Sequence, residues 1–194
     1  MNVLVVYCHP NPKSLIAAAC DRAVSSLTEA GHDVRVTDLY ADGFTPEMTA
    51  EERHSHKAAG IAHELERYAD ELRWAESLVL VYPTWWSGMP AMLKGWFDRV
   101  WVAGVAWSIP EGARRPKGLL RQIRPIVVVT SHGSSKWINV VEGEAGKRMV
   151  SRGIRGICSR RGRTRWCALY DVDNSTAEQR HKFLDRVDRT LARL

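Results

Sequence analysis

Five strand-like runs separated by helical segments are the feature that most constrains the fold of this chain. The runs are residues 2–7, 33–39, 77–83, 125–133 and 164–172. The first, "NVLVVY", is continuously apolar, which is typical of a strand buried on both faces, whereas the second alternates and belongs near a sheet edge. Strands that alternate with helices predict a parallel, doubly wound α/β sheet. The 194 residues, 45% of them hydrophobic, suit one compact domain spanning 1–194.

Three segments carry helix signals. Apolar residues recur every four positions over 15–27, which predicts a helix with one buried face. "TAEE" at 49–52 has the form of a capping box, and helical periodicity follows over 61–72. In the closing segment, Ser175 and Glu178 have the spacing of another capping box. We therefore expect helices in these three places.

Composition narrows the class of protein. No apolar run approaches the roughly 18 residues of a membrane span. The start "MNVLVVYCHP" lacks the basic flank and cleavage site of a signal peptide, so we expect a cytoplasmic protein. The four cysteines show no CxxC pair and no metal-finger spacing, which predicts buried free thiols and no metal site. The formal charge of +6 suits an anionic ligand without distinguishing a nucleotide cofactor from nucleic acid.

Ligands of doubly wound sheets bind beyond the carboxyl ends of the strands, where the winding direction reverses. After the first strand, "CHPNPKSL" contains two stiffening prolines, and Ser14 is placed to cap the next helix. The free amides of that helix, with His9 and Lys13 as extra donors, could hold a phosphate. The loop matches neither GxxxxGK[ST] nor GxGxxG, so an ordinary capped helix start is the alternative.

The loop after the third strand, "PTWWSGMP", is rich in rigid aromatic surface. Pro83 and Pro90 fix its ends, and Gly88 allows its backbone to approach a ligand. Trp85 and Trp86 could form the flat wall that an isoalloxazine ring needs, the alternative being that both are core or interface residues. After the fourth strand, "TSHGSSKW" exposes amides and hydroxyls that suit the polar pyrimidine end of a flavin, although it could be simply a loop.

The stretch "WWSGMPAMLKGWFDRV", together with "HPNPKS" and "TSHGSS", resembles the flavodoxin-like NAD(P)H:quinone oxidoreductases. This group includes DT-diaphorase and the bacterial quinone reductases that act as modulators of drug activity or are ancillary to potassium efflux. The resemblance covers most of the chain. It implies a flavodoxin-like three-layer fold, with a five-stranded parallel sheet in the order 2-1-3-4-5 and helices on both faces.

The resemblance also implies which residues hold the cofactor. The first loop would bind the flavin phosphate or diphosphate, the second the isoalloxazine, and the third the polar edge of the ring. The expected cofactor-binding residues are His9, Lys13, Ser14, Leu15, Pro83, Thr84, Trp85, Trp86, Ser87, Gly88, Thr130, Ser131, His132, Gly133 and Ser134.

Members of this family are homodimers with the active site at the subunit interface. Four aromatic residues could then pack a helix against the partner chain or could belong to the core of their own chain. They are Trp96, Phe97, Trp101 and Trp107.

One departure from the family limits what can be carried over. Mammalian-type members have a tyrosine and a histidine after the third loop that assist charge changes at the flavin, and the nearest positions here hold Trp137 and Glu142. An indole only donates a hydrogen bond, and a carboxylate is normally ionised. We therefore assign no residue as an essential acid or base.

The segment 147–165 carries eight Lys or Arg residues and no Asp or Glu. It could bind the adenosine phosphate of NADPH, because guanidinium groups suit phosphate oxygens. It could contact nucleic acid, although no nucleic-acid recognition motif accompanies it. It could also be a solvated helix face and loop.

These features predict a flavin-dependent oxidoreductase that takes hydride from NADH or NADPH and passes two electrons to a quinone or a similar flat acceptor by ping-pong kinetics. A flavin, azo or nitro reductase is one alternative. A flavin-binding regulatory subunit, for example of a potassium-efflux system, is another. FAD is favoured over FMN because the motif match is to FAD-using members, while residues 40–48 are too nondescript to show an adenine site.

Overall fold

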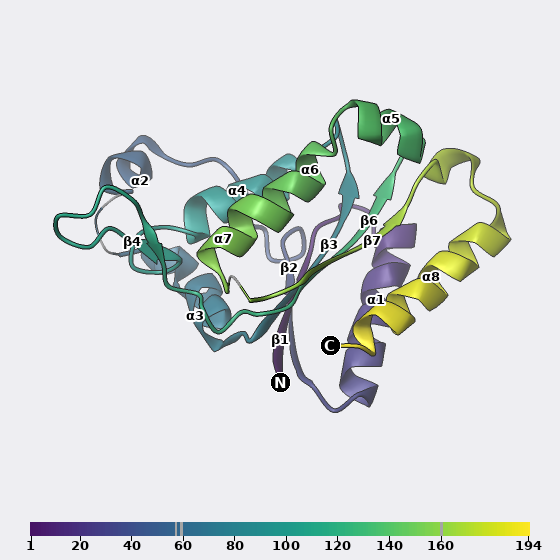
Figure 1. Cartoon of the computed structure of the whole chain (residues 1–194), viewed down its shortest axis with the longest axis horizontal. Coiled ribbons are helices and arrows are strands. Elements are labelled where there is room, and N and C mark those ends of the chain that lie inside the picture. Colours follow the sequence, from purple (N-terminus) through teal and green to yellow (C-terminus); the bar gives the residue numbers. More distant parts are fainter. Residues whose placement is uncertain (57, 59, 160) are drawn as a thin grey trace.

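The computed structural model describes residues 1–56, 58, 60–159 and 161–194. Five parallel strands form its main sheet, in the order β2-β1-β3-β6-β7, which confirms the expected topology (Figure 1). The strands are β1 (Asn2–Tyr7), β2 (Asp33–Asp38), β3 (Ser77–Thr84), β6 (Ile126–His132) and β7 (Thr164–Leu169). A small antiparallel pair, which the sequence did not predict, is formed by β4 (Trp107–Ser108) and β5 (Lys117–Gly118).

Helices cover both faces of the sheet, so the chain forms three layers (Figure 1). One face is covered by α1 (Leu15–Glu29) and α8 (Ala177–Leu191). The other face is covered by α3 (Glu66–Trp74), α4 (Ala91–Val100) and a helical stretch made of α6 (Ala145–Arg148), a π-helical turn (Met149–Ile154) and α7 (Arg155–Ile157). Two further short helices are α2 (Ala50–Ser55) and α5 (Lys136–Val141), and 3-10 turns lie at His63–Leu65 and Val172–Asn174.

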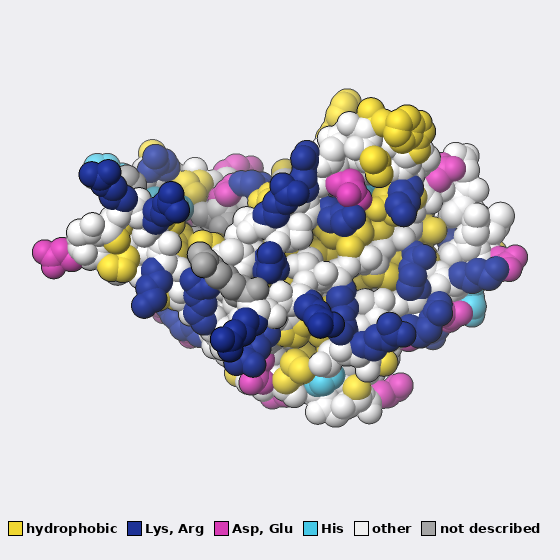
Figure 2. All heavy atoms as spheres, viewed as in Figure 1, with side chains coloured by type: hydrophobic (Ala, Val, Ile, Leu, Met, Phe, Trp, Pro, Cys, Tyr) yellow, Lys and Arg dark blue, Asp and Glu magenta, His cyan; other side chains and the backbone are white. Residues whose placement is uncertain are grey.

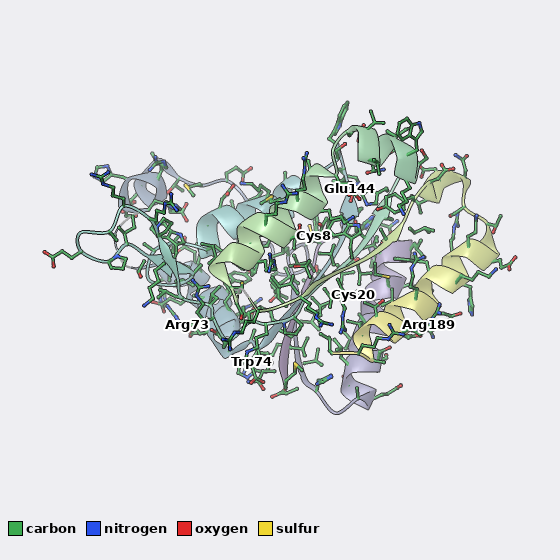
Figure 3. The ribbon with its side chains drawn as sticks, viewed as in Figure 1. Cys8, Cys20, Arg73, Trp74, Glu144 and Arg189 are labelled. Carbon is green, nitrogen blue, oxygen red and sulfur yellow. The ribbon has the colours of Figure 1, made fainter. Side chains whose placement is uncertain are left out.

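The two cores follow from the alternation of side chains along each strand. In β1, Leu4 and Val6 enter the core beneath α3 and α4, whereas Val3 and Val5 enter the core beneath α1 and α8. All seven residues of β6 are buried, while β2 at the edge is mostly accessible, as its alternating sequence predicts. All four cysteines are buried free thiols, and Figure 3 labels two of them, Cys8 and Cys20.

Two helix predictions need correction. The closing helix begins one residue later than expected, because Thr176 is its N-cap and forms the capping box with Gln179, not Ser175 with Glu178. The capping box of Thr49 is confirmed, but the helix that it begins ends at Ser55. The periodicity over 61–72 becomes helical only from the 3-10 turn at His63–Leu65.

The aromatic residues that could have served a partner chain belong to the core of their own chain. Trp96 is completely buried, and Phe97 and Trp101 are at least nine-tenths buried. Their rings pack edge-on or tilted, with centroids 4.9 to 6.1 Å apart. Trp107 is partly buried against the same core and donates its indole N–H to the Trp101 carbonyl at 2.8 Å.

Among the described residues, none of the helices combines the length and the apolar character that a bilayer crossing requires.

The close approach of α4 to the loop after β2 depends on Gly95. A Cβ at this position would lie 2.5 Å from the Cα of Pro46, which is closer than real Cβ contacts allow. Gly95→Ala should therefore lower the free energy of unfolding by about 1–3 kcal/mol, measured by urea denaturation.

Gly153→Ala is the matched control, because no atom lies within 4 Å of the added methyl group and the backbone there is helical. We expect it to leave stability unchanged or to raise it by about 0.5–1 kcal/mol. Equal losses in the two variants would contradict the predicted contact at Gly95.

Candidate functional site

A tight turn follows β3 and holds two tryptophans at the carboxyl edge of the sheet. The amide of Trp85 donates to the Gly88 carbonyl at 3.0 Å, and the amide of Gly88 donates back to the Trp85 carbonyl at 3.1 Å. The two residues between them, Trp86 and Ser87, have φ angles of 49° and 58°. Each such left-handed residue other than glycine costs roughly 1–2 kcal/mol. Backbone strain of this kind clusters at functional sites.

The turn exposes aromatic surface that a soluble chain usually buries. The Trp86 side chain is fully accessible to solvent, and Trp85 is 43% exposed. Trp85 also lies beside the first loop, with its ring centroid 6.2 Å from that of His9. The two indoles are therefore not core residues of this chain, and they are free to contact a flat molecule.

A cleft of about 640 Å³ lies beside this turn. Its residues come from the ends of β3 and β6, from α5 and from the segment after β7. They are Pro83, Thr84, Trp85, Trp86, Ser87, Ser131, His132, Gly133, Ser134, Asn139, Glu142, Val172 and Asp173. The structure thus brings the second and third predicted loops together at one cleft.

Two predicted residues lie behind the lining of this cleft. Gly88 closes the turn through its backbone, and Thr130 is completely buried, with its hydroxyl 2.9 Å from that of Thr84. The strand β6 continues through His132, so Ser131 and His132 belong to the strand, as the predicted range 125–133 implied, and the loop begins at Gly133.

The first loop lies next to the cleft and does not line it. His9 Nδ1 accepts from the Asn11 amide at 2.9 Å, and the Lys13 amide donates to Asn11 Oδ1 at 2.9 Å. The Ser14 hydroxyl accepts from the Ala17 amide at 3.1 Å, which confirms its capping role. The amides at the start of α1, beginning with Leu15, have no carbonyl partner within the helix and are suited to an anion.

His132 is the buried polar group of the cleft. Its side chain is 6% exposed, its ring stacks on Tyr170 with centroids 4.5 Å apart, and its Nε2 lies 3.4 Å from Thr84 Oγ1. Its Nδ1 has no hydrogen-bond partner among the described residues. Burial lowers the pKa of His132, an effect that Asn139 and the nearby glutamates only partly oppose. The environment of the imidazole therefore favours its neutral form.

Several residues of the cleft were missed by the sequence reasoning. Asn139 and Glu142 reach it from α5, and Val172 and Asp173 reach it from beyond β7. The chain turns there through Asp171, which has a φ of 55° and donates its amide to the Ser134 carbonyl at 3.0 Å. Ligands bind beyond the carboxyl end of the fifth strand as well as of the third and fourth. This rule could have predicted that residues after β7, such as Val172 and Asp173, reach the cleft.

The two positions that depart from the family pattern have different surroundings. Trp137 is 71% exposed and does not line the cleft. Glu142 does line it, and its carboxylate accepts a hydrogen bond from the Ser87 hydroxyl. Glu142 therefore fixes the tryptophan turn to the end of α5.

The neutral state of His132 predicts how stability depends on pH. Because the unfolded chain binds this proton more readily than the folded chain does, acidification favours unfolding. We expect the free energy of unfolding to fall as pH is lowered from about 7.5 to about 5.5, through the ordinary histidine pKa near 6.5. Urea denaturation at several pH values measures this dependence.

The contribution of His132 is isolated by comparing two variants. His132→Gln should reduce the pH dependence, whereas His181→Gln, an exposed position on α8, should retain it. A wild-type and a His132→Gln curve that run parallel across this range would contradict the buried neutral imidazole.

Comparison with known proteins agrees with this architecture. The family model described as "Flavodoxin-like fold" matches residues 1–190. The "Ribosyldihydronicotinamide dehydrogenase-like protein traD" of Penicillium crustosum is 32% identical over 69% of this chain and 58% of its own length. The human "Ribosyldihydronicotinamide dehydrogenase [quinone]" is 30% identical over 69% of this chain and 64% of its own length. The chain thus spans less than two thirds of these relatives.

A solved structure matches over more of the chain. The NAD(P)H:quinone oxidoreductase from Methanothermobacter marburgensis superimposes with a TM-score of 0.85 and 28% identity, covering 99% of this chain and 96% of that one. With the family model matching almost every residue, the chain belongs to the family with the flavodoxin-like fold.

Proposed function

We propose that this protein is a flavin-dependent NAD(P)H oxidoreductase that reduces quinones or similar flat acceptors. The observation that carries the proposal is the strained turn that holds Trp85 and Trp86 at a cleft that residues 131–134 also line. Relatives named as quinone-dependent dehydrogenases and a similar NAD(P)H:quinone oxidoreductase structure support it.

The residues of the cleft fit a flavin ring. A volume of about 640 Å³ lies within the range of small-molecule sites, and the two indoles supply a flat apolar wall. The same lining offers backbone groups, the Ser131 and Ser134 hydroxyls and the unpartnered Nδ1 of His132. A ring with an aromatic face and a polar edge would find complementary groups for both in this lining.

The phosphate end of the cofactor would lie at the start of α1. The amides of its first turn and the positive end of the helix dipole attract an anion. Lys13 and His9 flank this position, and the separation of 6.2 Å between the ring centroids of His9 and Trp85 supports a phosphate site next to the ring site. We retain His9, Lys13 and Leu15 as phosphate-site residues, while Ser14 acts by capping the helix.

The protein would contribute position and electrostatics to the reaction. When bound, the flavin would accept two electrons from NADH or NADPH and pass them to the acceptor. The turn would hold the ring against the cleft, and the buried His132, which lines the same cleft, would be the group able to exchange a proton when charge develops nearby. Because the indoles are exposed, nicotinamide and acceptor can stack in turn at one face.

The cofactor form and the assembly belong to the same proposal. We favour FAD, because the quoted motifs match FAD-using members most closely, with FMN as the alternative. We also propose a homodimer, as the family resemblance implies. Because Trp96, Phe97 and Trp101 are buried within their own chain, such a dimer would use other surfaces.

The proposal predicts a yellow protein. Purified protein should show the absorption bands of oxidised flavin, and these should bleach on addition of NADPH or NADH and recover when a quinone is added. Heat release followed by chromatography then identifies FAD or FMN. A colourless protein that takes up neither flavin would overturn the proposed function and with it the assignment of the three loops.

Trp86→Gly separates the role of the turn in stability from its role in binding. Removing the fully exposed indole relieves a left-handed residue, so the free energy of unfolding should rise by about 1 kcal/mol. The same change removes aromatic contact with the ring, so flavin affinity should fall by up to about tenfold. Urea denaturation and fluorescence titration with flavin measure the two effects.

The control is Trp137→Gly, which removes an exposed indole outside the cleft. It should leave flavin affinity unchanged. If Trp86→Gly binds flavin as tightly as the wild type does, the turn is not part of the ring site.

A further inference from the structure

The positive charge of this protein is concentrated in one segment. Residues 145–170 contain eight Lys or Arg and no Asp or Glu, whereas the whole chain has a formal charge of only +6. The remainder of the chain is therefore net negative by two charges. A segregated charge of this kind creates a local field that a uniformly basic protein lacks.

The fold arranges this segment as an amphipathic helix followed by an edge strand. Val150 and Ile154 point into the core beneath the helix, while Arg148 and Arg152, four positions apart, are exposed. The spacing places both arginines on the outer side of the same helix. One side of this helix thus holds it on the sheet and the other presents cations to solvent.

Further arginines extend the cationic surface beyond the helix. The carbonyl of Arg163 accepts from the Ile126 amide at 3.0 Å, and a side chain at Gly162 would lie 3.1 Å from the Cα of Arg124, so these segments adjoin. We call the exposed residues Arg124, Arg148, Arg152, Arg161 and Arg163 the basic face. In the part of the chain that the structure describes, none of these five forms an ion pair. Figure 2 shows Lys and Arg side chains across this side of the molecule.

Protection of the sheet edge explains only part of this surface. Charged residues commonly flank an edge strand and prevent pairing with another chain, and Arg163 lies directly before β7. Arg148 and Arg152 lie on a helix that covers a face of the sheet, where no edge needs protection. Edge protection therefore does not account for the two arginines of this helix.

An exposed apolar tip adjoins the basic face. Four large hydrophobic side chains of the short helix α5 are accessible, namely Trp137, Ile138, Val140 and Val141. A side chain at Gly143 would lie 3.2 Å from the guanidinium carbon of Arg148, so the cations begin where α5 ends. Figure 2 shows hydrophobic side chains gathered over α5 at the upper edge of the same view.

We propose that the basic face and the α5 tip dock this protein on an anionic lipid surface. Clusters of four to eight Lys or Arg are attracted to acidic headgroups, and each contributes a comparable increment to binding. Tryptophan and aliphatic side chains enter the boundary between headgroups and acyl chains. Nucleic acid would match the cations and leave the aliphatic tip without a complementary group, so the combination favours a membrane surface.

The docking itself does not depend on the proposed oxidoreductase activity, and a colourless protein would still be expected to bind.

Vesicle sedimentation with the full chain tests the proposal. We expect binding to vesicles that contain phosphatidylglycerol, no binding to pure phosphatidylcholine, and release at high salt. Arg148→Gln with Arg152→Gln should lower the partition coefficient roughly thirtyfold. Arg35→Gln with Arg53→Gln removes the same charge from exposed positions on β2 and α2 and should bind as the wild type does.

A second pair of variants tests the apolar tip. Trp137→Ser should lower partitioning about tenfold without changing its salt dependence. Ile109→Ser, at an exposed aliphatic side chain outside α5, should have no effect.

Three results would overturn the docking proposal. They are absence of binding to anionic vesicles at low salt, equal binding to neutral vesicles, and binding that is insensitive to both arginine changes. Arginine-dependent binding of duplex DNA without vesicle binding would reassign the face to nucleic acid. Self-association lost in Trp137→Ser, again without vesicle binding, would assign the tip to a second copy of the chain.

Discussion

The register between β3 and β6 is the constraint on which the cleft depends. Thr84 pairs with His132 at the ends of the two strands, and Thr84 Oγ1 lies 2.9 Å from Thr130 Oγ1. Because pairing continues to the last residue of both strands, the tryptophan turn and Gly133 leave the sheet at the same level. A slip of one residue would send each side chain to the opposite face, and the cleft would lose its lining.

The rigidity of these strands allows the adjoining turn to hold an unfavourable backbone. The central strands are buried on both faces by helices, and the positive φ angles of Trp86 and Ser87 occur two and three residues beyond the end of β3. Two further bonds hold the turn in place, because the Ser87 hydroxyl donates to Glu142 and the Ser87 carbonyl accepts from the Gly146 amide at 3.2 Å. These bonds hold the strained backbone of the turn in place and so keep its two indoles exposed.

The sheet could be predicted because the signals for it are local in the sequence. Apolar runs mark buried strands, and the end of each strand marks the binding edge. The sequence could not predict that Thr176 would cap α8 in place of Ser175, since both are good caps and tertiary packing decides between them. The sequence also could not predict the left-handed backbone of Trp86 or the burial of His132. Both depend on contacts with α5 and with the segment after β7, which are distant in sequence and carry no periodic signal.

The helix that carries Arg148 and Arg152 is joined to the turn that carries the tryptophans. Gly146 lies in the first turn of that helix, and a side chain there would come within 3.4 Å of the Ser87 carbonyl, so the two backbones are in contact. Glu144, labelled in Figure 3, pairs with Lys147 at 2.9 Å and anchors the start of the same helix. A displacement of this helix away from the turn must therefore break the hydrogen bond from the Gly146 amide to the Ser87 carbonyl.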